Sequence, residues 1–91
     1  MKGNLSYSMN PEQPKIFKTW FTGYVSGFIN NDPKFNRAMK LKEEHTYRVC
    51  QNIRYLCKSL NLDENDIRIA ETTALFHDIG RFPQYARYRT F

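Results

Sequence analysis

Residues 43–60 read EEHTYRVCQNIRYLCKSL, and their apolar side chains recur at the three- and four-residue spacing of one helical face. This face consists of Val49, Cys50, Ile53, Leu56, Cys57 and Leu60. Asp32 and Pro33 suit the start of the same helix as its N-cap and first-turn residue, so we predict a helix over residues 33–59. Extending the apolar face back by one turn brings His45 onto it.

Two further helices flank this one in the sequence. Residues 15–30 carry a broad apolar face, and residues 67–79 are apolar nearly all round, as expected of a helix buried inside a bundle. Asp63 suits the N-cap of the latter and Gly80 its end. We therefore predict an all-α helical bundle of about three main helices, followed by an aromatic and basic segment at residues 81–91.

Length and composition limit the class of protein. The 91 residues are 41% hydrophobic, which suits one small domain, and no apolar run is long enough to span a membrane. We predict a flexible polar arm over residues 1–14 and a single domain over residues 15–91. The net charge of +5 favours anionic partners such as phosphate esters, nucleotides or nucleic acid.

The two cysteines give the expected compartment. Cys50 and Cys57 are seven residues apart on one predicted helix, so their Cα atoms lie about 10 Å apart, beyond disulfide reach. Together with the absence of a signal-like start, free thiols predict a reducing, cytoplasmic location.

The candidate chemistry lies at His77 and Asp78, in the run Leu75 to Gly80 that reads LFHDIG. A lone His-Asp pair is more often a hydrogen-bonded core histidine beside a solvated or Arg-paired carboxylate. However, an Asp in the last helical turn opposes the helix dipole, and a bound cation would compensate it. The only other histidine, His45, is predicted on the inner face of the preceding helix, where antiparallel packing would bring it near His77.

At these residues the sequence resembles the HD-domain metal-dependent phosphohydrolases, in particular a bacterial and largely uncharacterised subgroup. That family has a His on one helix, a His-Asp pair at the end of a later helix, and a distant Asp. Here His45 resembles the first His, and His77-Asp78 followed by Ile79-Gly80-Arg81 resembles the pair. The resemblance covers roughly residues 17–91.

The resemblance implies the site residues and the cofactor. His45, His77 and Asp78 would bind a divalent ion (Mn, Mg, Fe, Ni, Co or Zn), and His77 and Asp78 would be the catalytic pair. The metal would activate a water for attack on a small phosphorylated substrate. Arg81 and Arg48 would bind the phosphate of that substrate, although ordinary surface charge is the competing interpretation.

The sequence also departs from the family pattern, because no Asp or Glu follows Asp78. We therefore expect the chain to be the N-terminal part of a longer domain, inactive or impaired as a hydrolase. The aromatic residues of its last segment are expected to form an exposed patch that favours a homo-oligomer. These residues are Phe82, Tyr85, Tyr88 and Phe91.

Two alternatives belong to other classes. A non-catalytic, basic helical module would bind a protein partner or nucleic acid through arginines interleaved with tyrosines near residue 90, although nucleic acid is the less favoured partner. Nucleophilic catalysis by Cys50 or Cys57 is weakly supported, because both lie on the apolar face and no motif surrounds them.

Overall fold

The structure, a computed structural model, describes residues 10–91, and these residues form helices without any β-strand. The helices are α1 (Gln13–Ser26), α2 (Pro33–Ser59), α3 (Glu64–Phe76) and α4 (Arg81–Tyr88). The prediction of an all-α fold with three main helices is confirmed, and the aromatic and basic segment supplies the short helix α4. Most of the predicted arm, residues 1–14, lies outside the described residues, and α1 begins within its last two positions.

The bounds of α2 agree with the prediction because both ends have local signals. Oδ1 of Asp32 accepts hydrogen bonds from the backbone N–H groups of Lys34 and Phe35. At the other end Asn61 adopts a left-handed backbone with φ of 60°, and the N–H of Leu62 donates to the carbonyl of Cys57. This closing motif satisfies the last carbonyls and turns the chain toward α3.

The predicted end of α3 is wrong. The helix ends at Phe76, and the next residues form successive turns in which backbone N–H groups bond to carbonyls three residues earlier, such as Ile79 to Phe76. Gly80 keeps a right-handed backbone and begins α4 instead of ending α3. His77 and Asp78 therefore lie in the connection between two helices. The prediction that Asp78 belongs to the last turn of α3 is wrong.

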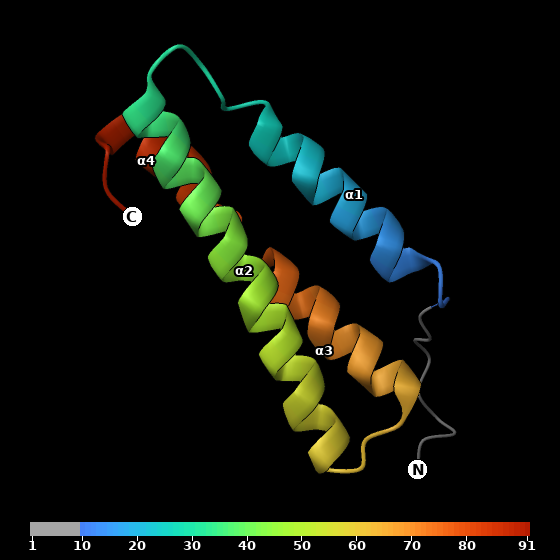
Figure 1. Ribbon diagram of the computed structural model, residues 1–91. Helices are drawn as coiled ribbons and strands as arrows, with labels where there is room; N and C mark the ends of the chain where they lie inside the picture. The colour runs from blue at the N-terminus through green and yellow to red at the C-terminus, as the bar shows by residue number, and fades with distance from the viewer. Residues whose placement is uncertain (1–9) are drawn as a thin grey trace.

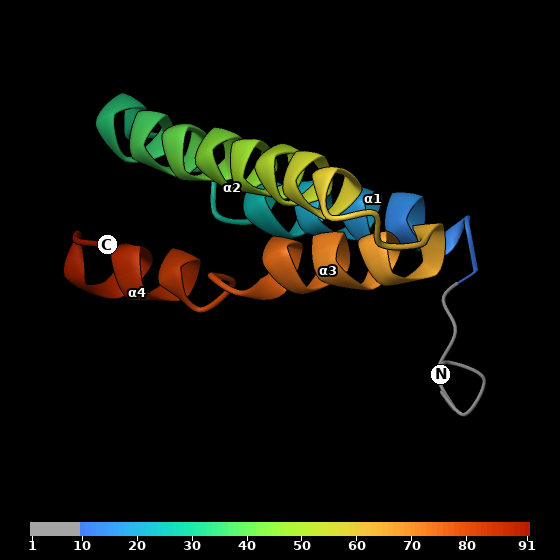
Figure 2. The same cartoon turned by 90° about the horizontal axis from the view of Figure 1, so that it is seen from below.

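The helices run side by side along α2 (Figure 1). In the orthogonal view α3 and α4 follow one another roughly in line beneath α2, and the turn that carries His77 and Asp78 joins them (Figure 2). The prediction that α3 is enclosed on all sides is wrong, since only Ile67, Ala74 and Leu75 of this helix are buried.

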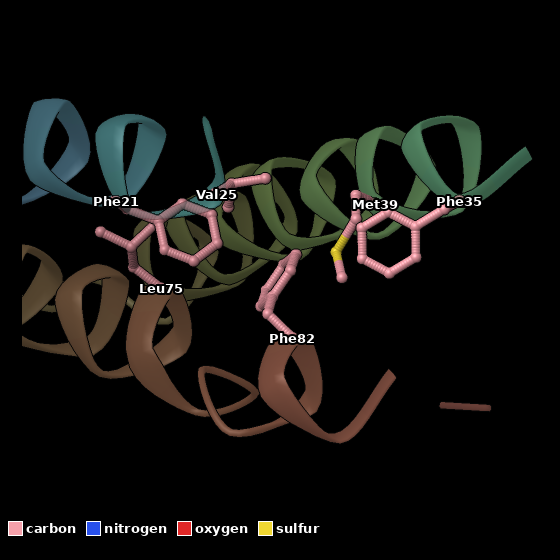
Figure 3. Packing of buried hydrophobic residues seen from close by; sticks show 6 residues of the cluster. All are labelled: Phe21, Val25, Phe35, Met39, Leu75 and Phe82. Carbon is pink, nitrogen blue, oxygen red and sulfur yellow. The ribbon is translucent and has the colours of Figure 1, made fainter. Parts of the chain in front are cut away.

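All four helices contribute to one core (Figure 3). Its buried residues are Phe21, Val25, Phe35, Met39, Leu75 and Phe82. The predicted exposed aromatic patch is wrong, because Phe82 is fully buried against Phe21 and Tyr85 packs on Phe35. Among the four aromatic residues of that segment only Tyr88 is largely exposed. Homo-oligomerisation stays a prediction, but the exposed aromatic patch on which it was based is absent from the described residues.

Within residues 10–91 no helix combines the length and the apolar character that crossing a bilayer requires.

Candidate functional site

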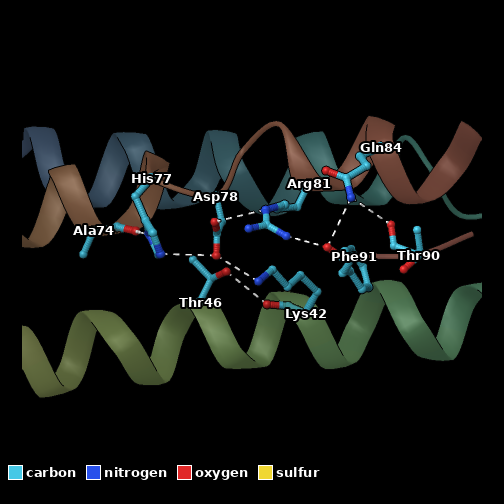
Figure 4. A network of polar contacts seen from close by, with 9 residues as sticks. All are labelled: Lys42, Thr46, Ala74, His77, Asp78, Arg81, Gln84, Thr90 and Phe91. Atoms are coloured by element: carbon cyan, nitrogen blue, oxygen red, sulfur yellow. Dashed lines mark hydrogen bonds and ion pairs between the residues drawn. The ribbon is translucent and has the colours of Figure 1, made fainter. Parts of the chain in front are cut away.

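The ring of His77 is held by a backbone carbonyl one turn earlier in the chain (Figure 4). Its Nδ1 lies 2.5 Å from the carbonyl oxygen of Ala74, and since a carbonyl oxygen only accepts hydrogen bonds, Nδ1 is the donor. The other ring nitrogen, Nε2, faces Oδ2 of Asp78 at 3.2 Å. The turn after α3 thus aims a ring nitrogen and a carboxylate oxygen at one another.

Asp78 is surrounded by two cationic side chains and the imidazole of His77. Its Oδ2 lies 2.8 Å from Nζ of Lys42, and its Oδ1 lies 3.6 Å from Nε of Arg81. The hydrogen bond from Lys42 holds the pKa of this carboxyl below its ordinary value, although partial burial works in the opposite direction. Asp78 is therefore an ionised carboxylate at neutral pH.

Lys42 is a site residue that the sequence prediction missed. It projects from α2 across to the turn after α3, and only 14% of its side chain is exposed. One turn later on α2, the buried hydroxyl of Thr46 donates to the carbonyl of Lys42. Lys42 precedes His45 by three residues, so the helical spacing that singled out His45 also places Lys42 on the same side of the helix.

The two predicted site residues of α2 have exposed side chains. The prediction that His45 lies on the inner face is wrong, because the inner positions around it are taken by buried Glu43 and Thr46. Arg48 is also exposed. Their roles in metal and phosphate binding stay predictions.

The donor atoms fit a divalent metal in part. Two ligands about 2.1 Å from one ion lie about 3 Å apart, which is close to the 3.2 Å between Nε2 of His77 and Oδ2 of Asp78. A third metal-ligating side chain does not lie close to these two in the described residues. Over the described range, no three His, Cys, Asp or Glu side chains cluster closely enough to hold an ion.

An apolar groove adjoins His77 between α2 and α3. It has a volume of about 360 Å³. Its lining residues are Val49, Ile53, Ala70, Thr73, Ala74 and His77. The groove gives the exposed edge of the imidazole an apolar neighbour large enough for a small organic group.

The surroundings of Cys50 are poorly suited to nucleophilic catalysis by its thiol. Cys50 lines a separate cavity of about 300 Å³ together with residues such as Lys18, Tyr47 and Glu71. Its thiol donates to the backbone carbonyl of Glu71, and burial raises its pKa above the ordinary value. A raised pKa lowers the fraction of reactive thiolate at neutral pH.

Comparison with protein-family models places part of the chain in a known family. A family model described as HD domain matches residues 43–90, which is more than half of the chain and includes His45, His77, Asp78 and Arg81. No curated protein and no solved structure matches the chain.

Proposed function

The chain belongs to the HD-domain family, and from this membership we propose that it is a metal-dependent phosphohydrolase acting on a nucleotide or another phosphate ester. The observation that carries the proposal is the pairing of His77 and Asp78. Donation from Nδ1 to Ala74 leaves Nε2 as the nitrogen that meets the Asp78 carboxylate. These two atoms lie about as far apart as two ligands of one metal ion, so a divalent cation would fit between them.

Histidine ligands of metals commonly have this arrangement, in which one ring nitrogen binds the ion and the other donates to a backbone carbonyl or a carboxylate. The Ala74 carbonyl fixes both the tautomer and the ring orientation of His77. His77 and Asp78 would then supply one nitrogen and one oxygen ligand, a set that suits divalent transition metals.

His45 is the third ligand in this proposal. It follows Lys42, which touches Asp78, by three residues, and it precedes Val49, which lines the groove beside His77, by four. Residues at these spacings share one side of a helix. We propose that a change of side-chain rotamer alone, without movement of the α2 backbone, turns the His45 imidazole toward Asp78.

The arginines give the site its affinity for phosphate. Arg81 begins α4 directly beside Asp78, and Arg48 lies on the exposed side of α2 one turn after His45. A guanidinium group binds phosphate oxygens through paired, charge-assisted hydrogen bonds. When bound, a divalent metal supplies an acidified water and polarises the phosphoryl oxygen.

The direct test is metal binding, because activity alone would not separate a lost ligand from a lost substrate. We expect Mn²⁺ titrated into chelator-treated protein to broaden the NMR signals of residues 77–81 selectively. His77→Ala and Asp78→Asn should weaken binding by 10-fold or more. Glu44→Gln is the matched control, because this exposed carboxylate next to His45 is no part of the proposed ligand set.

A phosphatase screen with Mn²⁺, Fe²⁺, Co²⁺, Ni²⁺, Zn²⁺ and Mg²⁺ follows from a positive result. Equal Mn²⁺ affinity of the unmodified protein and both variants, with folding verified by circular dichroism, would refute the proposed metal site.

A further inference from the structure

The cavity that Cys50 lines, with a volume of about 300 Å³, lies where α1 meets α2 and α3. α2 and α3 pack closely against each other, whereas α1 packs on this pair more loosely (Figure 1). The cavity shares no lining residue with the groove beside His77, and its volume is at the lower end for small-molecule sites. Its lining includes Pro14, Lys15 and Lys18 from α1, Tyr47 and Cys50 from α2, and Leu75 from α3.

The interior of the cavity is mainly apolar, because polar atoms of its lining already have partners. The hydroxyl of Tyr47 donates to Oε2 of Glu43 at 3.0 Å. The thiol of Cys50 donates to the backbone carbonyl of Glu71, and a cysteine in such a position behaves as a small apolar group. With the buried side chain of Leu75, these residues offer a ligand ring and hydrocarbon surface.

The charges around the cavity are unequal. Glu71, a carboxylate of the lining, is paired with Arg54, whose Nη1 lies 3.0 Å from Oε1. Lys15 and Lys18 lie about one turn apart on α1 and are exposed, and neither forms an ion pair with any residue of the described range 10–91. Nζ of Lys18 lies 5.1 Å from the centre of the Tyr47 ring, so this charge stands directly over the lining.

We propose that this cavity binds a small organic anion with a hydrocarbon chain and one carboxylate, the chemistry of a medium-chain fatty acid. The chain lies against Tyr47, Cys50 and Leu75, and the carboxylate meets Lys15 and Lys18 at the surface. Burial of the hydrocarbon supplies the affinity, and the two ammonium groups decide which end of the ligand faces water. A nucleotide is the wrong ligand, because an apolar interior leaves the polar atoms of its base and ribose without hydrogen-bond partners.

The ligand requirement is tested on the unmodified full chain by ¹H–¹⁵N NMR titration with sodium octanoate. The amide signals of Cys50 and Leu75 should shift. Octanoate should bind about threefold or more tightly than 1-octanol or octylamine, which carry the same chain without a negative charge. From butanoate to octanoate, each added methylene should tighten binding about twofold or more.

The role of the lysines is tested with a double variant. Lys15→Met combined with Lys18→Met should weaken octanoate binding about fivefold or more and leave the binding of 1-octanol unchanged. The matched control is Lys34→Met combined with Lys40→Met, because these exposed lysines of α2 lie outside the cavity and their removal changes the net charge equally.

Cys50 reports where the ligand binds. In a Cys57→Ala background, octanoate should slow the reaction of Cys50 with a neutral disulfide reagent in proportion to the fraction of protein occupied. Equal affinity for octanoate and 1-octanol, equal losses in the two lysine double variants, or a Cys50 that octanoate does not protect would each overturn the proposal. These measurements use neither metal nor phosphate, so their outcome is independent of the proposed function.

Discussion

Nζ of Lys42 lies 2.8 Å from Oδ2 of Asp78, although 36 positions separate the two residues in the sequence. The contact joins the first half of α2 to the turn between α3 and α4. Only 14% of the Lys42 side chain and 16% of the Asp78 side chain are exposed. Charges shielded in this way interact more strongly than a pair on an open surface.

We predict that Lys42→Met lowers the free energy of unfolding by about 1–3 kcal/mol at pH 7, because it leaves the Asp78 carboxylate without its nearest donor. The lowered pKa of Asp78 makes this effect pH-dependent. Its stabilising contribution is complete above the unfolded pKa of about 3.9 and is lost as the pH falls through the lower pKa of the folded state. Urea unfolding at pH 7 and across the acid range measures both effects.

The matched control is Lys40→Met, because 63% of the Lys40 side chain is exposed. Its Nζ lies 3.7 Å from Oε1 of Glu43, a longer contact than that of Lys42 with Asp78. This control should change stability by less than about 0.5 kcal/mol. A difference between Lys42→Met and the unmodified protein that stays constant down to pH 2 would mean that the Asp78 charge is not its source.

The core ring of α4 gives a second prediction. Phe82 is fully buried and its ring meets those of Phe21, Tyr24 and Phe28. Phe82→Ala should cost about 3–5 kcal/mol in thermal or urea unfolding, because it leaves a cavity between helices. Tyr88→Ala on the same helix should be nearly neutral. If both variants unfold at the same midpoint, α4 does not dock on the core as described.

Arg54 gives a third prediction, because it ties α2 to α3 through Glu64 at 2.5 Å and Glu71 at 3.0 Å. Glu64 is about half exposed, so water screens that contact and we expect Arg54→Met to cost only about 1 kcal/mol. The loss should shrink in 1 M NaCl if it is electrostatic. Exposed Arg37 provides the matched Arg→Met control, and equal losses in both variants would contradict a specific tie.

The thiol of Cys50 gives a fourth prediction. Burial raises its pKa, so at pH 8.5, where a free cysteine is about half ionised, Cys50 is mostly protonated. In a Cys57→Ala background it should react with a disulfide reagent more slowly than free cysteine does, and urea should restore the ordinary rate. A native rate equal to that of free cysteine would contradict this burial.

The sequence predicted those parts of the fold that local chemistry decides. The Asp32 and Asp63 caps and the periodic face of α2 were sufficient to place the starts of α2 and α3. The end of α3 was missed because the apolar pattern runs on through Ile79. Residues 77–80 instead form the turns between α3 and α4, which the apolar pattern does not reveal.

The candidate site shows the same division. The adjacency of His77 and Asp78 is local and was predicted, whereas the outward position of His45 depends on how α2 is rotated about its axis relative to α3. The apolar pattern of α2 alone does not determine that rotation closely enough to tell whether a residue at the edge of the apolar face points inward or outward. Lys42 was overlooked because charged residues are expected in solvent, and its long side chain reaches a carboxylate that lies 36 positions later in the sequence.

The turn at Asn61 also bears on the order in which the molecule assembles. It connects α2 and α3 over four residues, so these two helices form a hairpin with a small loop-closure cost. The first half of α2, by contrast, meets α1 and α4, which come from opposite ends of the described chain, and Phe21 must find Phe82 across 61 positions. We expect hydrogen exchange to be slowest along the hairpin and faster in α1 and α4. Lys42 and Asp78 lie where these regions meet, so local opening of α4 would take the site apart while most of the hairpin stays folded.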